Sequence, residues 1–121
     1  MNMYFVMQSN NGEVLTQLNT EMMKGMVDLL ILSVLNGADN YGYEISRSIK
    51  LKSQNQFDIP EPTLYLSLKR LESRSILRSY WGTESNGGRR KYYSLTEEGK
   101  DQFETLTNEW TEIRNLIDRF I

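Results

Sequence analysis

Two residue types that often carry chemistry are missing from this chain, because its 121 residues include no cysteine and no histidine. Without cysteine there can be no disulfide and no thiolate metal ligand, and without histidine the commonest metal ligand and general base are lost. The carboxylates are scattered over predicted helix surfaces, and no glycine-rich phosphate loop follows a predicted strand. We therefore expect neither an enzyme nor a protein that holds a metal or a cofactor.

Long apolar runs are missing as well. The longest, residues 26–35, is interrupted by Asp28 and Ser33. It falls short of the roughly 20 residues that a membrane-spanning helix needs. The first residues, MNMYFVM, lack the basic region of a signal peptide. The sequence therefore predicts a cytoplasmic protein, and its length predicts one compact domain.

Positive charge is scarce in the whole chain, with 14 Lys and Arg against 16 Asp and Glu, but it is unevenly distributed. Residues 1–40 and 96–121 carry net charges of −3 and −4, whereas residues 41–95 carry +5. Such an excess can belong to an ordinary solvated surface. A local basic segment between acidic ends is, however, typical of a DNA-binding module whose ends have other roles.

Apolar periodicity predicts helices after an irregular start. Residues 1–18 show no sustained period and are expected to form a frayed or loosely packed arm. A first helix is predicted from Asn19 or Thr20 to residue 35, where Asn-Gly ends it. A second, shorter helix is predicted over residues 41–52, and its exposed cations suit contact with a nucleic-acid backbone.

A third helix is predicted to follow Pro60-Glu61-Pro62, because proline is tolerated in the first helical turn. Its core-facing residues share one angular sector: Leu64, Leu68 and Leu71. Lys69 and Arg70 fall on the far side, where they could contact DNA or pair with neighbouring side chains. The free amides at the start of this helix favour a phosphate there.

Residues 76–95 predict a β-hairpin. Its strands are rich in β-branched and aromatic residues, and Ser-Asn-Gly-Gly at 85–88 is a strong turn signal. An isolated hairpin is marginally stable, so residues 92–95 are expected to anchor its base. Three consecutive cations follow the turn and could reach phosphates on both faces of the ribbon: Arg89, Arg90 and Lys91.

Three helices followed by a hairpin is the element order of a winged helix-turn-helix. In that fold the third helix enters the major groove and the hairpin, or wing, lies along the DNA backbone. The expected fold class is therefore mainly α with a small β-hairpin (α+β). Residues 19–95 would form the DNA-binding domain, and residues 96–121 would form one further helix with Thr96 as its N-cap.

The apolar residues of this last helix recur at spacings of three and four, like the seam of a coiled coil: Phe103, Leu106, Trp110, Ile113, Ile117 and Phe120. Such a seam can pack on the first helix of the same chain or can pair two chains, and its length favours a homodimer. Trp110 is either a core aromatic residue or, facing its copy across a two-fold axis, the wall of a cavity for planar aromatic ligands.

Four stretches carry a family resemblance: NTEMMKGMVDLLILSVL, NYGYEISRSI, EPTLYLSLKRLES and YWGTESNGGRRKYYSLTEEGK. With them the chain resembles the PadR family of bacterial winged-helix transcriptional regulators over residues 19–121. The resemblance implies a homodimeric repressor that binds an inverted-repeat operator and is released by a ligand or a stress signal. The short chain is similar to the small subfamily that includes multidrug-responsive repressors. The alternative function is an adaptor that binds protein or ligand without reading DNA.

The resemblance also implies DNA-contacting residues. The third helix would meet the major groove through Thr63, Tyr65, Lys69 and Arg70. The flanking backbone would be met by Arg89, Arg90 and Lys91. Two further residues, Tyr41 and Tyr43, would lie near the DNA or be buried against the third helix.

A ligand site is implied in the same way. Trp110 would line a pore at the dimer axis, with an adaptable apolar wall from Met22, Met26 and Leu29. Arg114, one turn beyond Trp110, disfavours cationic ligands unless Asp28 or Glu112 compensates. A pore filled by side chains is the alternative.

Overall fold

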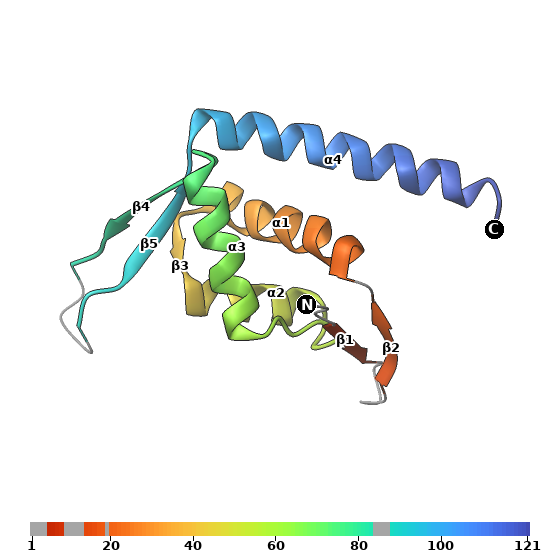
Figure 1. Ribbon diagram of the computed structural model, residues 1–121, viewed down its shortest axis with the longest axis horizontal. Coiled ribbons are helices and arrows are strands. Elements are labelled where there is room, and N and C mark those ends of the chain that lie inside the picture. The colour runs from red at the N-terminus through yellow and green to blue at the C-terminus, as the bar shows by residue number, and fades with distance from the viewer. Residues whose placement is uncertain (1–4, 9–13, 19, 84–87) are drawn as a thin grey trace.

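The computed structural model describes the backbone of residues 5–8, 14–18, 20–83 and 88–121, and the side chains from Met23 onward within those ranges. Four helices and two small sheets make up these residues (Figure 1). In chain order they are β1 (Phe5–Gln8), β2 (Val14–Leu18), α1 (Thr20–Gly37), β3 (Asn40–Tyr41), α2 (Gly42–Lys52), α3 (Glu61–Ser73), β4 (Leu77–Trp81), β5 (Lys91–Leu95) and α4 (Glu97–Asp118).

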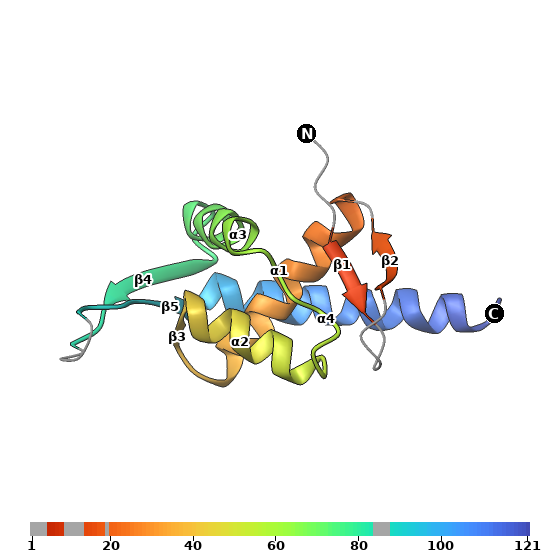
Figure 2. The same ribbon diagram turned by 90° about the horizontal axis from the view of Figure 1, so that it is seen from below.

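The N-terminal segment differs from the expected irregular arm. β1 and β2 form an antiparallel pair in which Phe5 lies opposite Leu18. This hairpin lies at the start of α1, at the end of the molecule remote from the wing (Figures 1 and 2). Strands of four and five residues are too short for a two-residue period to stand out in the sequence.

The hydrophobic core lies between α1, α2, α3 and the base of the wing. α1 contributes Val27, Ile31 and Leu35, one helical turn apart and at most 4% exposed. The predicted core residues of α3 are confirmed, with Leu64, Leu68 and Leu71 at most 2% exposed. Burying each of these side chains stabilises the fold by about 1.5–3 kcal/mol. Together they fix which face of α3 points outward.

The wing is a three-stranded antiparallel sheet with the order β3-β5-β4. Its base is anchored as predicted, because Tyr93 and Leu95 are buried while Tyr92 is half-buried. The two residues of β3, Asn40 and Tyr41, were predicted as the turn and start of a helix. They instead pair with Tyr93 and Tyr92 of β5. Most of the predicted Ser-Asn-Gly-Gly turn lies outside the described residues.

α4 begins where predicted. The Thr96 hydroxyl accepts a hydrogen bond from the Gly99 amide at 2.9 Å and donates one to the Ser75 carbonyl at 2.6 Å. The helix then runs along α1 and projects beyond the rest of the molecule (Figure 1). Among the residues that are described, none of the helices combines the length and apolarity that a transmembrane span requires.

Candidate nucleic-acid interface

The outward face of α3 is a ridge opposite its buried leucines. We call the four residues along it the α3 ridge: Pro62, Leu66, Lys69 and Ser73. All four are exposed, so Lys69 is available to a partner as predicted. Tyr65 lies beside the ridge and is 43% exposed, whereas Thr63 is half-buried.

Tyr65 is held against the first turn of α2. A Cβ atom added to Gly42 would lie 2.5 Å from the Tyr65 hydroxyl oxygen, so this close approach requires a glycine. Tyr43, the next residue of α2, is 67% exposed, while Tyr41 is half-buried in β3. The two tyrosines therefore differ, since Tyr43 faces solvent and Tyr41 packs on Tyr92 within the wing.

Arg70 does not join the outward face to which the sequence assigned it. Its Nη2 and Nη1 atoms donate hydrogen bonds to both carboxylate oxygens of Asp28 on α1, at 2.7 and 2.9 Å. The Arg70 and Asp28 side chains are only 24% and 14% exposed. Hydrogen bonding to Asp28 raises the pKa of Arg70 against the opposing effect of burial. The structure thus places Arg70 in an ion pair between α1 and α3, with a partner residue 42 positions away in sequence that local pattern could not reveal.

The cations that follow the turn of the wing each lie over an aromatic ring. The Arg90 guanidinium is 4.7 Å from the ring centroid of Tyr41, and that of Arg89 is 5.5 Å from Trp81. The Lys91 ammonium is 5.7 Å from the ring of Tyr93. Cation–π contacts of this kind favour one orientation of a long side chain. The two arginines thus lie over rings of β3 and β4, and only Lys91 lies over a tyrosine of its own GGRRKYY segment.

The wing is tied to α3 through Glu72. This carboxylate accepts a hydrogen bond from Ser79 of β4 and lies 3.8 Å from the ammonium of Lys91 on β5. The charge of Lys91 is therefore partly neutralised by Glu72. Its neighbours Arg89 and Arg90 lie over neutral aromatic rings. Burial, with the negative charge of Glu72, raises the pKa of the Tyr93 hydroxyl beneath them. Glu72 thus connects α3 to both long strands of the wing.

Stacked tyrosines fix the other side of the wing. The rings of Tyr80 and Tyr92 stack at 5.7 Å, and Tyr41 meets Tyr92 edge-on at 5.5 Å. The Tyr80 hydroxyl donates to Asp39 at 2.6 Å, and this hydrogen bond raises its pKa. These contacts connect β3, β4 and β5 across the sheet, so the wing is braced on both faces.

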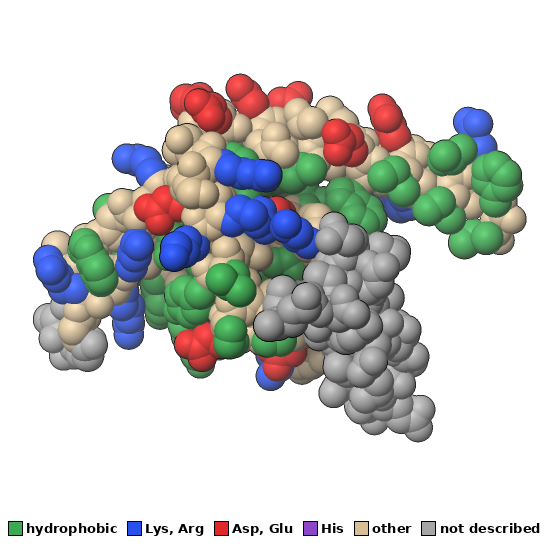
Figure 3. Space-filling view, viewed as in Figure 1, with side chains coloured by type: hydrophobic (Ala, Val, Ile, Leu, Met, Phe, Trp, Pro, Cys, Tyr) green, Lys and Arg blue, Asp and Glu red, His purple; other side chains and the backbone are tan. Residues whose placement is uncertain are grey.

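Charge is segregated across the molecule. Lys and Arg side chains gather over the middle of one face and along the wing, whereas acidic side chains line the top over α4 (Figure 3). The acidic residues of α4 are all exposed: Glu97, Glu98, Asp101, Glu104, Glu109, Glu112 and Asp118. On this face the cations of residues 41–95 thus lie apart from the acidic row of α4. No cluster of acidic side chains that could hold a metal ion occurs in the described part of the chain.

The predicted seam of α4 divides into two halves. Phe103 and Leu106 are half-buried and pack against the chain's own core. Trp110, Ile113 and Ile117 are 36–47% exposed, and Phe120, just past the helix end, is 80% exposed. The first two residues thus contribute to the core of the single chain, the other four are exposed, and pairing of two chains through the seam stays a prediction.

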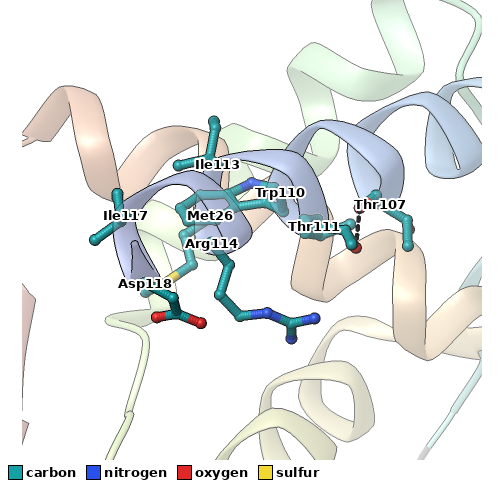
Figure 4. A pocket seen from close by; sticks show the side chains of 9 residues that line it. Met26, Thr107, Trp110, Thr111, Ile113, Arg114, Ile117 and Asp118 are labelled. Carbon is teal, nitrogen blue, oxygen red and sulfur yellow. Dashed lines mark hydrogen bonds between the residues drawn. The ribbon is translucent and has the colours of Figure 1, made fainter. Parts of the chain in front are cut away.

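A groove of about 460 Å³ lies between the exposed half of α4 and α1. Met26 and Leu29 line it from α1, as the sequence predicted for a ligand wall, and Trp110 lines it from α4. Trp110, Arg114 and Asp118 extend from α4 on the side of Met26 (Figure 4). The side chain of Met22 lies outside the described residues.

Comparison with known proteins identifies the fold. Residues 31–105 match the Transcriptional regulator PadR-like family. A transcriptional regulator from Clostridium thermocellum is 37% identical with a TM-score of 0.76, over 84% of this chain and 99% of that one. A PadR family transcription regulator from Clostridium difficile R20291 is 44% identical with a TM-score of 0.69, over 78% of this chain and 96% of that one.

A further relative is a Lysinibacillus sphaericus protein that is 40% identical over 102 residues, which are 84% of this chain and 94% of that protein. The expected winged helix-turn-helix with a long C-terminal helix is confirmed by the likeness to these structures. Family membership also confirms the expectation that the chain is no enzyme. The chain belongs to the PadR-like family of transcriptional regulators, and DNA binding is the activity that this membership implies.

Proposed function

We propose that the protein is a homodimeric repressor that binds an inverted-repeat operator and is released from it by a small-molecule ligand or a stress signal. The observation that carries the proposal is the arrangement of the wing. Arg89 and Arg90 are held over aromatic rings beside the exposed α3 ridge, while the acidic side chains are collected on α4. A fixed positive surface of this kind suits a duplex, whose phosphates supply most of the binding free energy.

In this proposal the α3 ridge enters the major groove and the wing follows the adjacent backbone. Lys69 and Tyr65 are exposed polar side chains available to the groove, and Tyr43 at the start of α2 is available to a phosphate. Arg89 and Arg90 would each neutralise a phosphate. Lys91 would contribute less because Glu72 lies 3.8 Å from its ammonium.

The exposed half of α4 supports the dimer. Trp110, Ile113 and Ile117 form an apolar stripe that a single chain leaves open to solvent. A second copy related by a two-fold axis would cover the stripe and present two recognition helices. Successive major grooves on one side of a duplex are about 34–36 Å apart, which sets the required separation.

The groove between α1 and α4 supports a ligand role. Its volume of about 460 Å³ lies within the usual range of ligand sites, about 300–1,000 Å³. Trp110 offers a flat wall to planar aromatic compounds, as in the multidrug-responsive subfamily that the chain resembles. Asp28 cannot offset the positive charge of Arg114 for a cationic ligand, because Arg70 already occupies its carboxylate. Asp118 lines the groove together with Arg114, so the groove presents one acidic and one basic side chain to a ligand.

α1 supplies a route from this groove to the DNA surface. Its residues Met26 and Leu29 line the groove, and Asp28 between them in sequence binds Arg70 of α3. A ligand that shifts α1 against α4 would shift Arg70 and the α3 ridge with it. Release then follows if the ligand binds the shifted form more tightly than the DNA-bound form.

The test uses fluorescently labelled duplexes tiled over the DNA upstream of the gene. One duplex should bind much more tightly than the others, with an affinity that falls steeply between about 50 and 200 mM salt. Light scattering should give the mass of a dimer. Equal binding to every duplex, or none, would favour the adaptor function instead. Planar aromatic dyes should quench Trp110 in a Trp81→Phe variant, and no quenching would refute the ligand site.

A further inference from the structure

Leu66 stands at the centre of the α3 ridge and faces solvent instead of the core. Its side chain is 58% exposed, although it belongs to a helix whose other leucines in that stretch are buried. Pro62 and Lys69 lie one turn before and after it on the same face. A single exposed leucine is ordinary on a protein surface. What assigns a role to this one is its place on the helix.

That place is fixed from both sides of the helix. On one side Tyr65 rests on Gly42 of α2, within 3 Å of the position that a Cβ atom would take. On the other side Arg70 is bound to Asp28 of α1 by two hydrogen bonds. α3 therefore cannot roll to bury Leu66. Leu66 therefore stays on the outward face that the proposed function places in the major groove.

The edges of the base pairs in the major groove offer one apolar group, the C5 methyl of thymine, among hydrogen-bond donors and acceptors. Leucine has no polar group and can gain only from that methyl. Lys69, one turn away, can bind guanine or a phosphate at the neighbouring position. We infer that Leu66 selects thymine in each half-site by packing on its C5 methyl group. This inference rests on the proposed role of α3 in the major groove.

Replacing thymine by uracil isolates this contact. Uracil lacks the methyl but keeps every hydrogen-bonding atom of the base edge, so only apolar contact is removed. The probe is a duplex selected by the wild-type protein from a random pool, prepared once with thymine and once with uracil. Loss of one buried methyl should weaken binding about fourfold, and loss of one in each of two half-sites about 14-fold.

Leu66→Ala is the test variant, and its exposed position means that the fold should tolerate the change. It should bind the thymine duplex more weakly than the wild type and show nearly equal affinity for the thymine and uracil duplexes. Leu51→Ala is the matched control, because Leu51 is a comparably exposed leucine, 55%, on α2. That variant should keep the wild-type preference for thymine.

The outcomes separate this inference from the proposed function. A wild-type protein that binds its selected duplex equally with thymine or uracil would overturn the inference and leave the operator function intact. The same holds if Leu66→Ala keeps the full preference for thymine, since another residue would then contact the methyl. If no duplex is enriched from the random pool, both the inference and the proposed function are wrong.

Discussion

The ion pair between Asp28 and Arg70 gives a quantitative prediction about how α3 is held. Exposed ion pairs contribute about 0–1 kcal/mol, whereas hydrogen bonds to charged groups contribute about 1.5–3 kcal/mol. This pair has two hydrogen bonds of 2.7 and 2.9 Å and side chains that are 14% and 24% exposed. It should therefore behave as a partly buried pair, for which the loss of one partner leaves the other charge without compensation.

We expect Asp28→Ala and Arg70→Ala each to lower the free energy of unfolding by about 3 kcal/mol. The double variant should lose about 4 kcal/mol instead of 6, which corresponds to a coupling energy of about 2 kcal/mol. Urea unfolding followed by circular dichroism at one fixed protein concentration measures these values. The slope of the unfolding free energy against urea concentration should stay unchanged, because the substitutions do not much alter the surface that unfolding exposes.

A second ion pair in the same chain is the control. The Lys50 ammonium lies 3.5 Å from Asp58, with side chains 48% and 64% exposed. Its coupling energy should not exceed about 0.5 kcal/mol. A coupling energy for Asp28 and Arg70 as small as this control would refute the reasoning. The slope of log affinity against log salt is a second check. If Arg70→Ala lowers this slope by the amount expected for about one phosphate contact, Arg70 contacts DNA and the reasoning is refuted.

Three further changes test other parts of the structure. Arg89→Ala combined with Arg90→Ala should weaken binding to all duplexes and lower the slope of log affinity against log salt by up to about 2; an unchanged slope would remove the wing from the interface. Ile113→Asp combined with Ile117→Asp should give monomers or an unfolded chain by light scattering, and a folded dimer would disprove the α4 interface. Gly42→Ala should weaken DNA binding while the melting temperature changes little, because the new methyl displaces only the end of the Tyr65 side chain. A large drop in melting temperature together with the loss of DNA affinity would contradict this.

Much of the fold follows from local pattern. The three leucines of α3 recur at helical spacing and are buried, and Thr96 precedes two glutamates and caps α4. The aromatic strands of the wing also follow from their composition. These elements are predictable because neighbouring residues decide them. β3, only two residues long, was missed because nothing in so short a segment distinguishes a strand.

The candidate site was predicted less completely, because its geometry depends on residues far apart in sequence. Lys69, Arg89 and Arg90 are exposed as expected, but Arg70 is paired with a residue of α1 that sequence spacing cannot reveal. The rings under the wing cations come partly from β3, so the pairing of Arg90 with Tyr41 depends on that unpredicted strand.

The division of α4 into a covered and an open half has a similar origin. Its apolar spacing is uniform from Phe103 to Ile117, so the sequence shows no boundary. The boundary arises where α4 passes the part of α1 that covers it. α4 has 22 residues and α1 has 18, so at 1.5 Å per residue they are about 33 and 27 Å long. The lengths and the relative positions of α1 and α4 decide which residues of α4 remain open to solvent. The apolar spacing in the sequence does not contain this information.

The start of α4 is fixed to the body of the protein, so a small tilt there produces a large displacement at the far end of the helix. Gly99 is packed against the carbonyl of Ile76, and Thr96 bonds the carbonyl of Ser75, so the first turn of α4 is fastened to the residues that enter β4. A tilt of 5° about this joint displaces the far end of a 33 Å helix by about 3 Å. In the proposed dimer, small rearrangements where two copies meet would thus change the distance between their wings, and the crossing angle of the two α4 helices would select the length of the spacer between half-sites.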